Sequence, residues 1–198
     1  MYRRFGKRII DTILAAGGIV VFAIPMLIIG ICIKVDSKGP IIFKQSRLGK
    51  NKQPFKVMKF RTMCDHAYEK GGIAKKSDDP RITNVGAFLR RTSLDELPQF
   101  WNVFKGDMSV VGPRPHMVKQ TDEYSSLIPK YMVRHFAKPG ITGWAQVTGF
   151  RGETSELWQM EGRVKKDIWY IEHWTIWLDI KIMWLTVKNV FVGDKNAY

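Results

Sequence analysis

Residues 12–33 read TILAAGGIVVFAIPMLIIGICI, an uncharged apolar run that decides how the start of the chain folds. As a helix this run would be about 33 Å long, enough to cross a hydrocarbon core of about 30 Å. A cleaved signal peptide fits poorly, because the run is too long and Asp11 interrupts the basic segment before it. The sequence therefore predicts a membrane helix.

Two features leave open whether this helix crosses the membrane. Pro25 lies in the middle of the run, where it removes a backbone hydrogen bond and predicts a kink. Basic residues flank the run on both sides, within residues 3–8 (among them Lys7 and Arg8) and within residues 34–50. The positive-inside rule needs an asymmetry that is absent here. A kinked spanning helix and a re-entrant helix that returns to the same face are equally compatible with the residues.

The overall charge predicts an anionic partner. The 198 residues include 32 Lys+Arg and 18 Asp+Glu, a net charge of +14, which suits anionic lipid, a phosphorylated substrate or nucleic acid. Residues 34–63 alone hold nine basic residues and one acidic residue. Because this charge adjoins the membrane segment, we expect lipid and phosphate contacts and no nucleic acid. The alternative is a non-enzymatic, membrane-anchored basic module that binds anionic lipid or nucleic acid.

Beyond the apolar run the pattern is mainly helical, with a little β structure. Two β-prone runs, residues 41–45 and 55–60, flank a polar loop and predict a hairpin. We expect a helix over about residues 95–105, ended by Gly106. Residues 156–192 have an amphipathic helical pattern with several of the seven tryptophans, typical of interfacial helices mixed with core positions.

These elements predict an α+β fold that is mainly helical. The expected architecture is a Pro-kinked membrane helix, a small β-hairpin, and amphipathic interfacial helices around the catalytic helix. We place the membrane anchor at residues 1–35 and a cytosolic interfacial catalytic domain at residues 36–198. Residues 64–80 read as a mobile polar loop, and the glycine-rich residues 139–149 would allow backbone to approach a ligand. The cysteines and histidines lack the spacing of a disulfide framework or a zinc site.

Residues 90–99, RRTSLDELPQ, place two adjacent carboxylates directly after two arginines. One interpretation is a capping box in which Ser93 begins a helix and Glu96 folds back onto it. Pro98 argues against it, since the proline would then delete an intrahelical hydrogen bond. A helix that begins at about residues 95–97 suits the proline better and leaves both acids at the positive end of the helix dipole.

The other interpretation is covalent catalysis at phosphorus by Asp95 and Glu96. A carboxylate that attacks a pyrophosphate must approach another anion, so it needs cations to screen the repulsion. Mg²⁺ commonly takes one or two carboxylates together with phosphate oxygens, which suits this acidic pair. Neighbouring residues on a helix point about 100° apart, so the two acids should differ in role.

Four basic residues are candidates for the phosphate contacts. Lys59 and Arg61 should share one face if they lie in one strand. Arg90 precedes the acidic pair, and Arg114 lies between two prolines that would hold its guanidinium rigidly. The substrate phosphate-binding candidates are therefore Lys59, Arg61, Arg90 and Arg114.

Together these segments resemble the bacterial sugar transferase family, the monotopic polyprenyl-phosphate phosphoglycosyl transferases. The resemblance covers nearly the whole chain and depends on the order and spacing of several motifs. They are the kinked N-terminal helix, KFRTM (59–63), LRRTSLDELPQ (89–99), NV (102–103), KGDMS (105–109), GPRP (112–115) and PGITG (139–143).

The resemblance implies a re-entrant helix on the cytoplasmic face of the bacterial inner membrane. It implies transfer of a sugar 1-phosphate from a UDP-sugar to undecaprenyl phosphate with release of UMP, which initiates surface polysaccharide assembly. Asp95 would be the nucleophile of a phosphosugar-enzyme intermediate, and Glu96, beside Asp95, would bind Mg²⁺. Lys59 and Arg114 would contact phosphate, with Arg90 assisting.

Two C-terminal motifs indicate the donor. FRGET (150–154) and WLDIK (177–181) resemble the hexose-1-phosphate branch of the family, typified by the undecaprenyl-phosphate glucose phosphotransferases, so UDP-glucose or UDP-galactose is the expected substrate. The oligomeric state stays open, with a homodimer among the alternatives.

Overall fold

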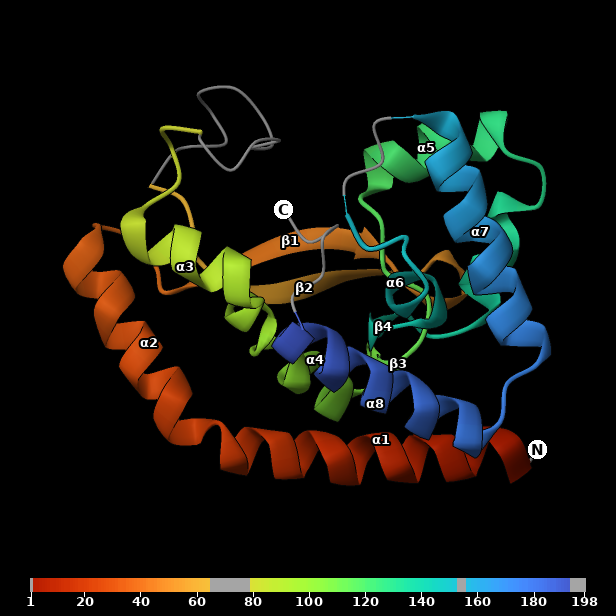
Figure 1. The fold of residues 1–198 in the computed structure, drawn as a ribbon, viewed down its shortest axis with the longest axis horizontal. Coiled ribbons are helices and arrows are strands. Elements are labelled where there is room, and N and C mark those ends of the chain that lie inside the picture. Colours follow the sequence, from red (N-terminus) through yellow and green to blue (C-terminus); the bar gives the residue numbers. More distant parts are fainter. Residues whose placement is uncertain (1, 65–78, 153–155, 193–198) are drawn as a thin grey trace.

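The computed structural model describes residues 2–64, 79–152 and 156–192, so part of the predicted loop at residues 64–80 lies outside the described residues (Figure 1). Helices dominate, and two small sheets complete the fold, which confirms the mainly helical α+β class. The α-helices are α1 (Tyr2–Val21), α2 (Ala23–Asp36), α3 (Asn84–Thr92), α4 (Gln99–Lys105), α5 (Val118–Leu127), α6 (Trp144–Val147), α7 (Leu157–Glu172) and α8 (Ile176–Val192). The strands are β1 (Ile42–Leu48), β2 (Pro54–Phe60), β3 (Ser109–Val111) and β4 (Gly140–Thr142), and 3₁₀ turns cover Lys50–Lys52, Leu94–Glu96 and Tyr131–Phe136.

The apolar N-terminal run forms a bent pair of helices rather than one straight helix. Helices α1 and α2 meet at Phe22 and differ in direction by 59°. The cause is Pro25, which lacks the N–H that would bond the Val21 carbonyl one turn earlier. The break therefore lies three residues before the proline, where the sequence predicted a kink at the proline itself.

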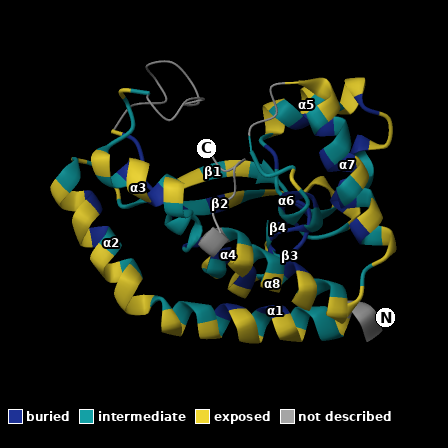
Figure 2. Ribbon diagram, in the orientation of Figure 1, coloured by how far each residue is buried: buried dark blue, intermediate teal, exposed yellow. Residues whose placement is uncertain are grey.

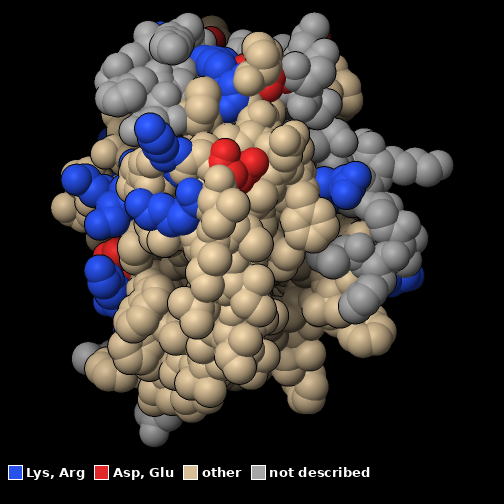
Figure 3. All heavy atoms as spheres, turned by 90° about the vertical axis from the view of Figure 1, so that its left-hand side faces the viewer, with Lys and Arg blue, Asp and Glu red and all other residues tan. Residues whose placement is uncertain are grey.

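Among the described residues, this pair of helices alone has the length and the apolar composition needed to cross a membrane. No single helix there is both long and apolar enough; the arms at residues 5–21 and 23–36 qualify only when taken together. Their outer faces carry exposed apolar side chains, including Ile13, Leu27 and Val35, the last 84% exposed (Figure 2). Figure 3, which looks at the side formed by α2, shows a broad surface without charged side chains below a band that contains Lys and Arg.

The inner face of α1 is fixed to the rest of the protein by polar side chains. Lys7 Nζ lies 2.5 Å from Asp179 on α8. Arg8 donates to the Val103 and Phe104 carbonyls at the C-terminal end of α4, at 2.6 and 2.8 Å, where a helix leaves carbonyls unpaired. Lys7 and Arg8, which the sequence places in the basic flank before the apolar run, therefore bond groups within the protein.

Asp11 completes this attachment. Its carboxylate is buried and accepts hydrogen bonds from Ser109 Oγ at 2.9 Å and from the Val110 backbone N–H at 3.0 Å. The acid that interrupts the basic segment thus holds α1 against β3.

The predicted hairpin is confirmed, with longer strands than expected. β1 pairs antiparallel with β2 from Ile42↔Phe60 to Leu48↔Pro54. Val57 and Phe60 on β2 are buried, and because they are three positions apart their side chains point to opposite faces of the hairpin. Val57 packs with Ala15 and Val103, whereas Phe60 packs with Ile33 and Leu89, so both faces contribute to the core.

The glycine-rich segment at residues 139–149 folds against the chain itself. β4 pairs in parallel with β3, and a Cβ at Gly140 would lie 2.1 Å from the Gly112 nitrogen. A Cβ at Gly143 would lie 2.2 Å from the Gly112 oxygen. These glycines therefore allow close backbone packing in the protein core, where the sequence suggested an approach to a ligand.

The tryptophans of the two C-terminal helices are all exposed, where the sequence predicted a mixture of core and surface positions; they are Trp158, Trp169, Trp177 and Trp184. α7 packs through Met160 and Val164, and α8 packs through Ile182. Trp144 and Trp174 are half-buried against the α8 side of the core, whereas Trp177 and Trp184 on α8 are exposed (Figure 2). Exposed indoles on a helix beside α1 suit an interfacial position.

Candidate active site

The turn that carries the two acids begins at Ser93. Ser93 ends α3 in the left-handed conformation, with φ 58° and ψ 16°, and a 3₁₀ turn at Leu94–Glu96 follows. Helix α4 begins only at Gln99, with Pro98 in the N-cap position. The predicted start, at about residues 95–97, is two to four residues too early, because Pro98 has no N–H to continue an earlier helix and is accommodated at the helix start instead. The predicted end is confirmed, since Gly106 closes α4 at φ 96°.

The capping box does not form at this turn. Ser93 makes no side-chain cap, and its hydroxyl instead accepts a hydrogen bond from Arg151 at 2.8 Å. The Glu96 carboxylate bonds two cations. Charge-assisted bonds of this kind are stronger than the return bond of a capping box to a neutral N–H.

Glu96 brings three separate parts of the chain together. Its Oε1 accepts from Lys59 Nζ, on the hairpin, and from Arg114 Nη2, each at 2.7 Å. Its Oε2 lies 3.3 Å from Arg114 Nη1, so the guanidinium meets both carboxylate oxygens. Lys59 also reaches Asp95 Oδ2 at 3.4 Å. The structure thus brings together four of the six predicted site residues.

The two acids have different electrostatic environments although they are adjacent. Burial raises the pKa of Asp95; Lys59 opposes this shift and the negative charge of Glu96 reinforces it. Burial would also raise the pKa of Glu96, but the cations of Arg114 and Lys59 outweigh it and hold that pKa well below its usual range. Glu96 is therefore a fixed negative charge, while Asp95 is the more basic carboxylate. Such a separation is typical of paired carboxylates with distinct chemical roles.

Arg114 is held by its backbone as well as by the flanking prolines. Its carbonyl accepts a hydrogen bond from Arg134 Nη2 at 2.8 Å, and the same Arg134 nitrogen is 2.6 Å from Asp167. Arg134 and Asp167 are both buried, and Arg134 also contacts His116 and Tyr131. This buried network fixes the segment that presents the Arg114 guanidinium. No local sequence pattern predicts this network, because its members come from segments far apart along the chain.

Arg61 and Arg90 lie outside this cluster. β2 ends at Phe60, and the Arg61 guanidinium then turns to the C-terminal end of α2, where it donates to the Ser37 carbonyl at 2.7 Å and to the Lys38 carbonyl. The expectation that Arg61 shares a face with Lys59 is wrong for this reason. Arg90 Nε donates to Thr62 Oγ1 at 2.9 Å.

The residues present would fit a magnesium ion whose coordination is completed by substrate phosphates. Among the described residues no group of three or more His, Cys, Asp or Glu could hold a metal ion. Asp95 and Glu96 supply two adjacent carboxylates. Among the described residues, the side-chain hydrogen bonding of Asp95 consists of the long contact from Lys59 to Oδ2. The Oδ1 atom of Asp95 is therefore available to a metal ion. One or two carboxylates completed by phosphate oxygens is a common Mg²⁺ environment.

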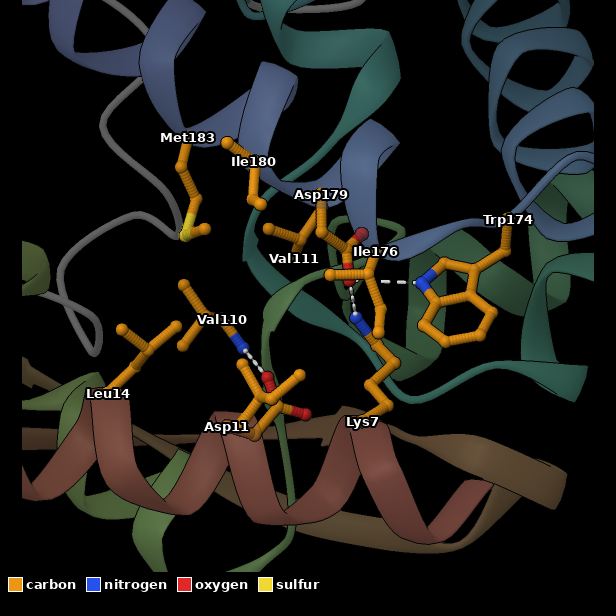
Figure 4. Close-up of a pocket in the computed structure, with 11 residues that line it drawn as sticks. Lys7, Asp11, Leu14, Val110, Val111, Trp174, Ile176, Asp179, Ile180 and Met183 are labelled. Carbon is orange, nitrogen blue, oxygen red and sulfur yellow. Dashed lines mark hydrogen bonds and ion pairs between the residues drawn. The ribbon is translucent and has the colours of Figure 1, made fainter. Parts of the chain in front are cut away.

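A small pocket between α1 and α8 shares no residue with this cluster (Figure 4). Figure 4 shows Lys7 of α1 directed at Asp179 of α8 and Asp11 of α1 bonded to Val110, with Trp174 at one end. Trp174 Nε1 donates to Asp179 Oδ2 at 3.0 Å, and Leu14 is among the apolar side chains that line the pocket. This pocket lies where α1 and α8 pack together and contains neither of the adjacent acids. The candidate active site is therefore the cluster around Glu96.

The family model of the bacterial sugar transferases matches residues 2–193. The chain belongs to this family. It is 50% identical over 195 residues to an Escherichia coli protein named UDP-glucose:undecaprenyl-phosphate glucose-1-phosphate transferase, an alignment that covers 98% of this chain and 42% of the relative. A protein of the same name from Caulobacter vibrioides is 46% identical, with 97% of this chain and 72% of that relative covered.

A third relative is a galactosyl transferase from Streptococcus agalactiae. It is 41% identical over 198 residues, with 94% of this chain and 42% of the relative covered. The chain therefore spans less than half the length of two of these three relatives.

We predict that neutralising the two acids changes stability in opposite directions. Because the folded protein raises the pKa of Asp95, ionised Asp95 costs stability at pH 7, and Asp95→Asn should raise the Tm by a few degrees. That gain should disappear as the pH falls through the raised pKa and Asp95 becomes protonated. Glu96→Gln leaves Lys59 and Arg114 without their charged partner and should cost about 1–3 kcal/mol.

Thermal unfolding in detergent at pH 5 and pH 7 measures both effects. The matched controls are Asp122→Asn and Glu123→Gln, neighbouring exposed acids on α5, which should shift the Tm little. A loss of stability in Asp95→Asn at pH 7 as large as that in Glu96→Gln would contradict the assigned environments.

Proposed function

We propose that this chain transfers a hexose 1-phosphate from a UDP-hexose to undecaprenyl phosphate and releases UMP. The observation that carries the proposal is the Asp95–Glu96 pair beside Lys59 and Arg114, in which the partly buried Glu96 is a fixed charge and the buried Asp95 is the more basic carboxylate. Family membership and the names of the relatives support the same reaction.

In the first step a carboxylate oxygen of Asp95 bonds to the phosphorus that carries the hexose. The bond from that phosphorus to the bridging oxygen breaks, and UMP leaves with the bonding electrons. Burial makes Asp95 a stronger base than an exposed aspartate, which favours nucleophilic attack. Lys59 and Arg114 supply positive charge where the attacked phosphate oxygens gain negative charge.

In the second step a phosphate oxygen of undecaprenyl phosphate attacks the same phosphorus. The bond between phosphorus and Asp95 breaks, which regenerates the carboxylate and gives a hexose linked to the lipid through a diphosphate. Glu96 stays ionised throughout, and its bonds to Lys59 and Arg114 keep both cations beside Asp95. Asp95 and Glu96 would hold Mg²⁺ with the donor phosphates, where the ion would neutralise phosphate charge.

The bent helix pair supports a re-entrant attachment to the cytoplasmic face of the bacterial inner membrane. Both helices of the pair are attached to the rest of the protein. Asp11 on α1 bonds β3, and Arg61 donates to the Ser37 and Lys38 carbonyls just after α2. A straight spanning helix would place its two ends about 30 Å apart on opposite sides of the membrane. The exposed apolar faces between these ends would then lie in lipid, with basic residues near the anionic leaflet.

The reaction is tested by UMP release in detergent with Mg²⁺, undecaprenyl phosphate and a panel of UDP-sugars. UDP-glucose should be the best donor, since two of the relatives are named for it, with UDP-galactose next. Asp95→Asn should lower the rate on the order of 10³-fold or more, because it removes the nucleophile. Asp122→Asn, a change at an exposed acid on α5, should retain the wild-type rate.

Full activity in Asp95→Asn would contradict the covalent mechanism. Lipid binding that ignores Asp95 and weakens steeply with salt, without any UMP release, would instead favour a basic lipid-binding module.

Sidedness is tested by cysteine labelling in intact cells. Cys32 and Cys64 are exposed, so both are first changed to serine, and single cysteines are then introduced as Tyr2→Cys or Lys38→Cys. The re-entrant attachment predicts that a membrane-impermeant maleimide labels neither position until the membrane is permeabilised. Labelling of one position from outside, with the other protected, would show that the pair spans the membrane.

A further inference from the structure

The loop after α6 is held in one shape by α7. Gly149 turns the chain at φ 98°, and the Phe150 N–H donates to the Ala145 carbonyl at 3.0 Å. Arg163, buried on α7, donates to the Phe150 carbonyl at 3.1 Å and to the Gly152 carbonyl at 2.7 Å. These two carbonyls flank Arg151, so a single buried guanidinium fixes the backbone on both sides of that residue.

The Phe150 ring fixes the same loop from its other side. A Cβ at Gly162 would lie 2.3 Å from Phe150 Cε1, so the ring lies directly on the bare backbone of α7. Residues 149–152 therefore form a rigid support that presents Arg151.

Arg151 reaches the turn that carries the two acids. Its Nη2 donates to Ser93 Oγ at 2.8 Å, across 58 positions of the chain. Ser93 is in the left-handed region at φ 58°, a conformation that its Cβ disfavours. The Ser93 carbonyl accepts from the Glu96 N–H at 3.2 Å, so the conformation of Ser93 sets where the turn places Asp95 and Glu96.

We propose that Arg151 is a positioning residue that holds Ser93 in its left-handed conformation and thereby orients Asp95 and Glu96. Its catalytic consequence rests on the proposed function. Arg163 and the contact of Phe150 with Gly162 hold residues 149–152 rigidly. The hydrogen bond from Arg151 to the Ser93 hydroxyl connects this rigid segment to the turn.

The test uses Arg151→Met, Ser93→Gly and the double variant, with Lys165→Met, an exposed change on α7, as control. Arg151→Met should lower kcat for UMP release about tenfold, since small displacements of reacting groups cost 10- to 100-fold, and should leave the KM for UDP-glucose within about twofold.

Glycine adopts the left-handed conformation without a steric penalty. Adding Ser93→Gly to Arg151→Met should therefore restore kcat to about that of Ser93→Gly alone. A raised KM that Ser93→Gly does not restore would show that Arg151 binds the substrate directly and would overturn the proposal.

Hydrogen exchange without substrate separates this inference from the proposed function. The Glu96 and Leu97 amides bond to the Ser93 and Leu94 carbonyls within the turn. Arg151→Met should speed their exchange severalfold, and Ser93→Gly should reverse part of that change. Unchanged exchange at these amides would overturn the positioning role even if UMP is released. Faster exchange in a protein that releases no UMP would support the positioning role and contradict only the proposed function.

Discussion

The pairing of Glu96 with Lys59 and Arg114 is the constraint on which the site depends. It joins the hairpin, the 3₁₀ turn and the proline-flanked segment that carries Arg114. Three partly buried charged groups are costly unless they satisfy one another, so the fold keeps this geometry or loses stability. Asp95, beside Glu96, is thereby held among cations that Glu96 only partly neutralises. This arrangement explains why an acidic pair occurs in a chain with a net charge of +14.

The N-terminal helix pair packs against the rest of the protein through polar side chains. The Lys7–Asp179 ion pair attaches α1 to α8, and Asp11 attaches it to β3. Arg61, which the sequence assigned to phosphate, instead bonds carbonyls at the end of α2. The division of the chain at residue 35 stays a prediction, and these contacts show that the regions on its two sides pack against each other.

The sequence predicts those features whose cause is local. The hairpin, the kink near Pro25 and the end of α4 at Gly106 each follow from residues within a few positions. The left-handed Ser93 does not follow from local propensity, since serine is an unremarkable residue in most conformations. Its conformation is understood only with its long-range partner, Arg151, in view.

The contacts of Lys59 and Arg114 with Glu96 could be predicted from the sequence only in part. The residue types point to phosphate chemistry, but the chain positions do not say which cations converge. Arg90 is closer in sequence to the acids than Arg114 is, yet it bonds Thr62. Sequence distance is a poor guide here, because the last turn of α3 points Arg90 toward the segment after the hairpin, whereas Arg114 is delivered by a separate, proline-fixed segment.

In the proposed mechanism Asp95 carries the hexose phosphate between donor and acceptor. The most direct measurement is the intact mass of the protein after incubation with UDP-glucose and Mg²⁺ in the absence of undecaprenyl phosphate, followed by fragmentation of the peptide at residues 92–105. We predict a gain of one hexose phosphate, located on Asp95, that disappears when undecaprenyl phosphate is added. Release of UMP that requires the acceptor, with no mass gain at any stage, would contradict the covalent route.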